Sequence, residues 1–176
     1  MHNPTRYTLP AIAFHWITAL LVVVLFGLGW YMVELPKGPQ RGEMFALHKS
    51  LGLTVLWLLG LRLAWRLGHR PPELPATIPA WQRRLASGVH HLLYLLLLLQ
   101  PVSGYVSSSF SGHDTKYFGI PLPSWGHHDA AVNEFFTEVH EVVSITLLAA
   151  IVLHLVGALS HLRPGEENVL RRMWPF

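Results

Sequence analysis

Residues Val132 to Leu162 read VNEFFTEVHEVVSITLLAAIVLHLVGALSHL, and this stretch decides the fold of the chain. His140, His154 and His161 interrupt a run otherwise dominated by Val, Ile, Leu and Ala. A helix rises about 1.5 Å and turns about 100° per residue, so the three rings share one face, with His140 and His154 about 21 Å apart along the axis. Ionisable side chains inside a membrane span normally face the bundle interior and mark functional groups. The stretch therefore predicts a membrane helix whose histidines have partners on other helices.

The composition is typical of a membrane protein. Of the 176 residues, 51% are hydrophobic and only 13% are charged. The chain has no cysteine, which excludes disulfides, iron–sulfur clusters, thiolate zinc sites and covalently attached c-type haem. Histidine, with 12 copies, remains the candidate metal ligand. The net charge of +3 comes from basic residues that flank apolar runs, so nucleic-acid binding is not expected.

Four apolar runs are long enough to cross a bilayer core of about 30 Å. They cover about residues 11–35, 45–67, 85–106 and 132–162. The first run exceeds the usual apolar length of a signal peptide, and no small-residue cleavage site follows it, so we expect it to be retained. The sequence predicts an all-α fold, an integral membrane four-helix bundle with up-down-up-down topology, built as a single domain by residues 1–176.

The basic residues predict the orientation of this bundle. If both termini are cytoplasmic, nine of the 13 Lys and Arg residues lie on the inner side and four on the outer side. Because inner loops of membrane proteins carry such an excess, both termini are predicted to be cytoplasmic. The inner residues are Arg6, Arg62, Arg66, Arg70, Arg83, Arg84, Arg163, Arg171 and Arg172, and the outer ones are Lys37, Arg41, Lys49 and Lys116.

The histidines of the four spans form two pairs by depth. In antiparallel spans, His15 near the inner start of the first lies at the level of His154. His48, at the outer start of the second, lies at the level of His140. A four-helix bundle holds a haem by bis-histidine axial ligation, with one imidazole from each of two helices at the same level. Zinc instead needs three or four convergent ligands. We predict two haems; the alternative is histidines that hydrogen-bond across helices or lie at the membrane interfaces.

Two further histidines fall near the inner pair without being needed as ligands. His90 opens the third span and His161 lies near the inner end of the fourth. Imidazoles there are able to donate hydrogen bonds to a quinone and to pass the protons that its reduction requires. We therefore predict an inner quinone site at His90 and His161; the alternative is two interface histidines that contact water or lipid headgroups.

Three basic residues are candidates to balance haem propionates. Arg62 and Arg66 lie one turn apart near the inner haem, and Lys49 lies beside His48. The alternative is that the arginines serve only the membrane orientation and that Lys49 extends outward to the interface. The outer connection also contains histidines and aspartates, but their spacing is irregular and we predict no metal site there. These residues are His113, Asp114, His127, His128 and Asp129.

Several short motifs occur in a specific order and spacing. They are Phe14-His15-Trp16, Leu47-His48-Lys49-Ser50-Leu51-Gly52, His90 with Tyr94 and Pro101, His140 followed by His154, and Gly119-Ile120-Pro121-Leu122-Pro123. On these residues nearly the whole chain resembles the bacterial cytochrome b561 family, whose four-helix members bind two b haems. The resemblance implies a multi-pass bacterial inner-membrane protein, with His15 and His154 on the inner haem and His48 and His140 on the outer one.

The resemblance also implies a function, transmembrane electron transfer. Some stand-alone members oxidise superoxide outside the membrane and deliver the electrons to ubiquinone, and the size of this chain suits that activity. The outer side carries seven acidic against four basic residues, a net charge of about −3, which does not favour a small anion. The alternative is a membrane-anchor cytochrome b subunit that relays electrons between a periplasmic dehydrogenase or hydrogenase and quinone. A third, non-redox reading is a small four-helix scaffold or transporter without haem.

Overall fold

Four long helices dominate the computed structural model, which describes residues 6–73, 75, 77–160 and 169–175. They are α1 (Leu9–Glu34), α2 (Pro39–Gly68), α3 (Ala80–Phe110) and α4 (Ala130–Ser160), each long and apolar enough to cross a membrane. A hairpin of two short strands, β1 (Lys116–Tyr117) and β2 (Ile120–Pro121), joins α3 to α4, and a 3₁₀ turn, η1 (Val169–Arg172), follows. The predicted all-α membrane fold is therefore confirmed; His161 lies outside the described residues.

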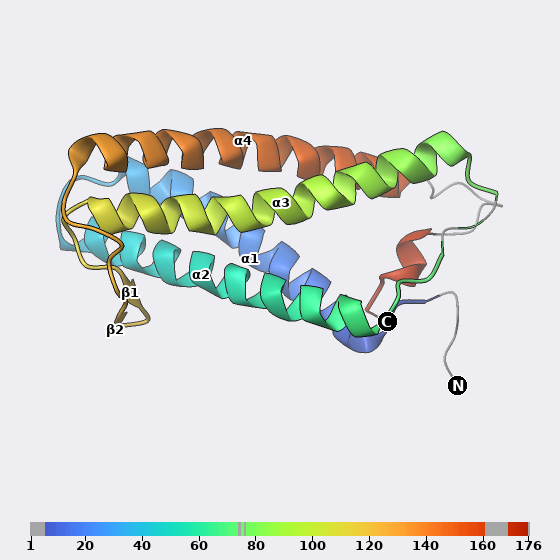
Figure 1. The fold of residues 1–176 in the computed structure, drawn as a ribbon. Coiled ribbons are helices and arrows are strands. Elements are labelled where there is room, and N and C mark those ends of the chain that lie inside the picture. Colours follow the sequence, from blue (N-terminus) through green and yellow to red (C-terminus); the bar gives the residue numbers. More distant parts are fainter. Residues whose placement is uncertain (1–5, 74, 76, 161–168, 176) are drawn as a thin grey trace.

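The helices pack side by side in one elongated bundle (Figure 1). Helix α3 runs along α4, α1 along α2, and α2 also contacts α3. The connections from α1 to α2 and from α3 to α4 lie at the end that carries the β-hairpin, which we call the hairpin end. The connection from α2 to α3 lies at the opposite end together with η1, which we call the terminal end.

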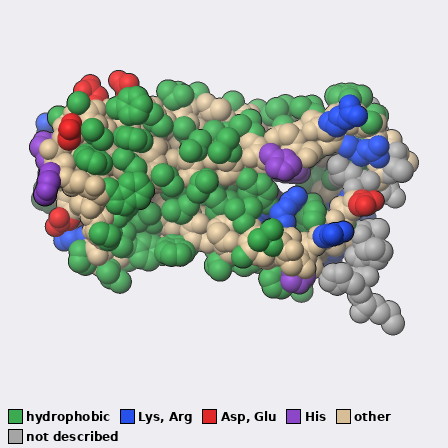
Figure 2. Space-filling view, in the orientation of Figure 1, with side chains coloured by type: hydrophobic (Ala, Val, Ile, Leu, Met, Phe, Trp, Pro, Cys, Tyr) green, Lys and Arg blue, Asp and Glu red, His purple; other side chains and the backbone are tan. Residues whose placement is uncertain are grey.

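The bundle has a modest buried core and an apolar exterior. Leu96 of α3 packs against Val143, Leu147 and Ala150 of α4, and all four are buried. Many large apolar side chains, such as Trp57, are exposed on the helices instead. Figure 2 shows hydrophobic side chains over the middle of the visible face and charged ones gathered at the two ends. Such an apolar band between polar ends is what a lipid-facing surface requires.

The hairpin is fastened to the start of α2. Strands β1 and β2 are antiparallel, and the turn between them places both Phe118 (φ 46°) and Gly119 (φ 89°) in the left-handed region. The Phe118 amide donates a hydrogen bond of 3.0 Å to the hydroxyl of Ser50, which itself donates to the Ala46 carbonyl at 2.9 Å. Ser50 is buried and lies two residues from His48, so the outer connection is held against the helix that carries this histidine.

The two ends of the described chain meet at the terminal end. The Tyr7 amide donates to the Arg172 carbonyl at 3.1 Å, and the Trp16 indole donates to the Met173 carbonyl at 2.7 Å. The rings of Trp16 and Trp174 also meet edge to face, 5.6 Å apart. Residues 172–174 are thereby fixed beside the start of α1.

Candidate functional site

One histidine pair lies at the hairpin end. His48 of α2 and His140 of α4 have ring centroids 6.2 Å apart and planes inclined by 76°. Both side chains are half-buried and line a small cavity of about 40 Å³ together with Lys49, Gly52 and Gly104. The structure thus brings together the two residues that the sequence pairs by depth.

His140 is held in one orientation by α3. Its Nδ1–H donates to the Gln100 carbonyl at 2.8 Å, while its Nε2 accepts from the Gln100 amide nitrogen at 3.0 Å. The two contacts define a single tautomer, with the proton on Nδ1 and the lone pair on Nε2. A carbonyl that receives the other ring proton is the usual support of a metal-ligating histidine. In this tautomer a metal would bind at Nε2, in place of the Gln100 amide that donates to it here.

Glycines allow both rings to approach their neighbouring helices. A Cβ at Gly104 would lie 3.0 Å from Cε1 of His140 and 3.1 Å from its Nδ1. A Cβ at Gly29 of α1 would lie 3.4 Å from Cε1 of His48. The Nδ1 of His48 is buried, and no described residue offers it a hydrogen bond. A buried nitrogen without a hydrogen-bond partner or a bound metal costs folding free energy.

The second pair lies toward the terminal end and has a third histidine beside it. His15 of α1 and His154 of α4 have ring centroids 6.2 Å apart, the same separation as in the first pair. His90 of α3 lies 5.2 Å from His154 by the same measure. His15 and His154 are half-buried, whereas His90 is exposed. Two of the rings are thus enclosed, and the third faces the surface.

The spacing of the pairs fits axial ligation of a haem iron. With metal–nitrogen bonds of about 2 Å and each ring centroid about 1 Å behind its nitrogen, two axial imidazoles have centroids about 6 Å apart. Both pairs match that distance at 6.2 Å, and the shorter distance from His90 to His154 does not. Within the described parts of the chain, no three or more His, Asp or Glu residues are grouped to hold a metal ion directly. The arrangement therefore fits two bis-histidine haem sites better than a zinc site.

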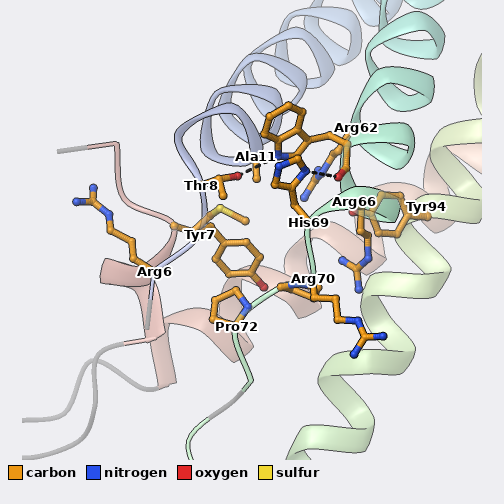
Figure 3. Close-up of a pocket in the computed structure, with 13 residues that line it drawn as sticks. Arg6, Tyr7, Thr8, Ala11, Arg62, Arg66, His69, Arg70, Pro72 and Tyr94 are labelled. Atoms are coloured by element: carbon orange, nitrogen blue, oxygen red, sulfur yellow. Dashed lines mark hydrogen bonds between the residues drawn. The ribbon is translucent and has the colours of Figure 1, made fainter. Parts of the chain in front are cut away.

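Two arginines of α2 lie toward the second pair and the neighbouring His90. Arg62 and Arg66 both pack on the ring of Tyr94, with guanidinium carbons 5.2 and 5.7 Å from the ring centroid. Arg62 is close enough to His15, His90 and His154 to act electrostatically on all of them. Figure 3 shows Arg62 and Arg66 beside Tyr94 at the wall of a terminal-end cavity. Of the three predicted propionate partners, two thus lie near one pair, and Lys49 lies near the other.

Sequence reasoning missed the contacts that α3 makes with His140. Gln100 is the single amide in the apolar part of the third span, and this isolated polar residue was the available signal. In the outer connection, His128 contacts the Phe110 carbonyl through Nδ1 at 3.0 Å, next to Gly112. The Asp129 carboxylate accepts from the amides of Ala131 and Val132, so it caps α4.

Comparison with known proteins gives one consistent result. A family model described as "Prokaryotic cytochrome b561" matches residues 6–176. "Cytochrome b561 homolog 2" of Escherichia coli is 33% identical over 182 residues, covering 98% of this chain and 93% of that protein. "Cytochrome b561 homolog 1" of the same organism is 27% identical, covering 97% of each chain. "Cytochrome b562" of Cereibacter sphaeroides is 30% identical, covering 98% of each.

Proposed function

Because the chain belongs to the prokaryotic cytochrome b561 family, which transfers electrons across the membrane by b-type haem, we propose that it holds two such haems, one at each histidine pair. The chain is a multi-pass protein of the bacterial inner membrane, as its four apolar helices and its relatives show. The observation that carries the proposal is the equal separation of 6.2 Å in the two pairs.

The proposed ligands are His15 with His154 and His48 with His140. A b-type haem held by such a pair supplies reversible one-electron chemistry. Arg62 and Arg66 would balance the propionates at the terminal-end pair. Lys49 would do so at the hairpin-end pair, whose cavity it lines.

We propose that residues 1–176 form one domain with up-down-up-down topology and both termini in the cytoplasm. The excess of basic residues at the terminal end supports this orientation. The hairpin end then faces the periplasm, and the two pairs lie at successive depths between the two sides. Electrons would enter at the hairpin end and leave at the terminal end.

The proposed electron acceptor is ubiquinone, bound at the terminal end. His90 is exposed, yet its ring lies 5.2 Å from that of His154, so it adjoins a haem ligand and is open to a substrate from the membrane. Reduction of a quinone to a quinol takes two electrons and two protons, and an imidazole at this place is suited to deliver protons. His161, the other predicted quinone residue, remains a prediction outside the described chain.

The proposed electron donor is superoxide. Oxidation of two superoxide ions gives two O₂ molecules and the two electrons that reduce one quinone. The family resemblance and the single-domain size support it. The test is quinol formation by the purified protein in a superoxide-generating system, with haem-free protein as the control. A periplasmic dehydrogenase that copurifies with the chain and alone reduces its haems would favour the relay-subunit alternative.

The haem proposal itself is tested by the reduced-minus-oxidised spectrum and the ratio of haem to chain. Wild-type protein is expected to hold two b haems. His48→Ala and His15→Ala are each expected to hold one, because each variant removes a ligand from a different pair. A single haem in the wild type, or an unchanged ratio in either variant, contradicts the assignment.

A further inference from the structure

A cavity of about 140 Å³ opens at the terminal end, between the start of α1, the end of α2 and Tyr94 of α3. Figure 3 shows the side chains that surround it. None of the described residues that line it is acidic, and four of them are arginines. These four are Arg6, Arg62, Arg66 and Arg70. Among its described lining residues, basic groups therefore outnumber acidic ones, and Arg62, Arg66 and Arg70 lie at the end of α2 or just beyond it.

Contacts with aromatic rings orient part of this charge without neutralising it. Arg62 and Arg66 share the ring of Tyr94, at 5.2 and 5.7 Å from its centroid. A cation–π contact leaves the full charge of a guanidinium in place. Two guanidinium groups on one ring repel each other, and an anion between them and Arg70 would remove that cost.

Neutral polar groups complete the lining. The hydroxyl of Thr8 accepts a hydrogen bond of 2.9 Å from the Trp65 indole and keeps its own O–H as a donor. The ring of His69 is stacked on that of Trp65, with centroids 3.9 Å apart. Arginines with a hydroxyl donor among aromatic rings are suited to a phosphate oxygen, because guanidinium groups bind phosphate by paired hydrogen bonds.

The position of the cavity favours a membrane lipid as the molecule that would supply such a phosphate group. Tyr7, Trp65 and Tyr94 line it, and such aromatic residues gather where membrane helices meet the headgroup layer. Basic pockets between membrane helices bind the headgroups of anionic lipids. We propose that this cavity binds the phosphate headgroup of an anionic phospholipid.

This lipid site shares Arg66 with the haem proposal and differs from it at Arg70. Arg62 is the arginine that acts on all three histidines of the neighbouring cluster. Arg70 lies beyond the end of α2, and Figure 3 shows it beside Pro72, away from Arg62. The headgroup would therefore lie at Arg66 and Arg70, and its binding does not require a quinone.

The test is native mass spectrometry of the full-length protein, purified with its haems in detergent. Phosphatidylglycerol or phosphatidylcholine is added at equal concentration, and the fraction of protein that retains one lipid is measured. Wild-type protein is expected to retain the anionic lipid at least about tenfold better, because charge-assisted hydrogen bonds to phosphate are made there. The double variant Arg66→Gln/Arg70→Gln is expected to lose most of this preference.

The matched control is Arg83→Gln/Arg84→Gln, which removes two charges from the start of α3 that do not line the cavity. It is expected to keep the preference within about twofold, since only general surface attraction is lost. Helix content measured by circular dichroism reports whether each variant is folded, because Arg66 is also a proposed propionate partner. Equal retention of the two lipids by the wild type, or equal losses in the two double variants, overturns the proposal. Displacement of the lipid by millimolar inorganic phosphate overturns it as well, because the ligand would then be free phosphate.

Discussion

Replacing Gly104 by alanine should damage the hairpin-end haem site while leaving the fold intact. The added Cβ would lie 3.0 Å from Cε1 of His140 and 3.1 Å from Nδ1, where ordinary contacts begin at 3.4 Å. The ring cannot withdraw freely, because its Nδ1–H is bonded to the Gln100 carbonyl at 2.8 Å. The imidazole must therefore shift by about 0.4 Å and weaken that hydrogen bond, or α3 must move away from α4.

The expected magnitude follows from two opposing effects. Alanine stabilises a helix by about 1 kcal/mol relative to glycine, whereas overpacking a fitted contact costs about 1–3 kcal/mol. Disturbing the group that orients a metal-ligating histidine typically lowers affinity by about 10–100-fold. Redox titration and low-temperature electron paramagnetic resonance should show one altered or lost low-spin haem in Gly104→Ala, with the other unchanged.

Gly88→Ala provides the matched control on the same helix. Nothing lies within 4 Å of a Cβ at Gly88, so this variant should keep both haems with their wild-type potentials. Its helix should be stabilised by about 1 kcal/mol. If Gly104→Ala retains both haems with unaltered potentials and spectra, Gly104 does not set the position of His140, and the reasoning is refuted.

Three further changes test other parts of the structure. Asp129→Ala should destabilise the start of α4 by about 1 kcal/mol, measured as faster amide exchange at Ala131 and Val132, whereas Asp129→Asn should retain the cap. Ser50→Ala should remove the hydrogen bond of the Phe118 amide and destabilise the protein by about 1 kcal/mol. Unchanged hydrogen exchange of that amide would show that Ser50 does not hold the hairpin. His90→Gln should slow quinone reduction without lowering the haem ratio, and a lost haem would instead make His90 a ligand.

The sequence predicted the helices and the proximity of the histidines because both depend on simple periodicities. Apolar length defines a membrane helix, and the position of a residue along an antiparallel span gives its depth. His15 and His154, which were predicted to lie at one level, have ring centroids 6.2 Å apart. The family resemblance was confirmed by the match over residues 6–176.

The details that depend on how helices rotate against each other were not predictable. Gly104 and Gln100 contact His140 because α3 presents one particular face to α4, and depth alone does not fix that rotation. The contact between Trp16 and Trp174 joins residues at opposite ends of the sequence, where no periodicity applies. Similarly, the hydrogen bond from Phe118 to Ser50 depends on the fold of an irregular connection. Such contacts follow from packing and require the three-dimensional structure.

The charges around the two pairs argue for one direction of electron flow. Arg62 acts on His15 and His154, and positive charge stabilises the reduced form of a haem. At the hairpin end, Lys49 acts on His48, whereas Glu141 acts on His140 with the opposite sign. The terminal-end haem should therefore have the higher potential and receive electrons from the hairpin end. Arg62→Gln should lower that potential in a redox titration and slow quinone reduction, whereas Arg84→Gln should not; equal potentials in Arg62→Gln and wild type would show that the arginine does not set the direction.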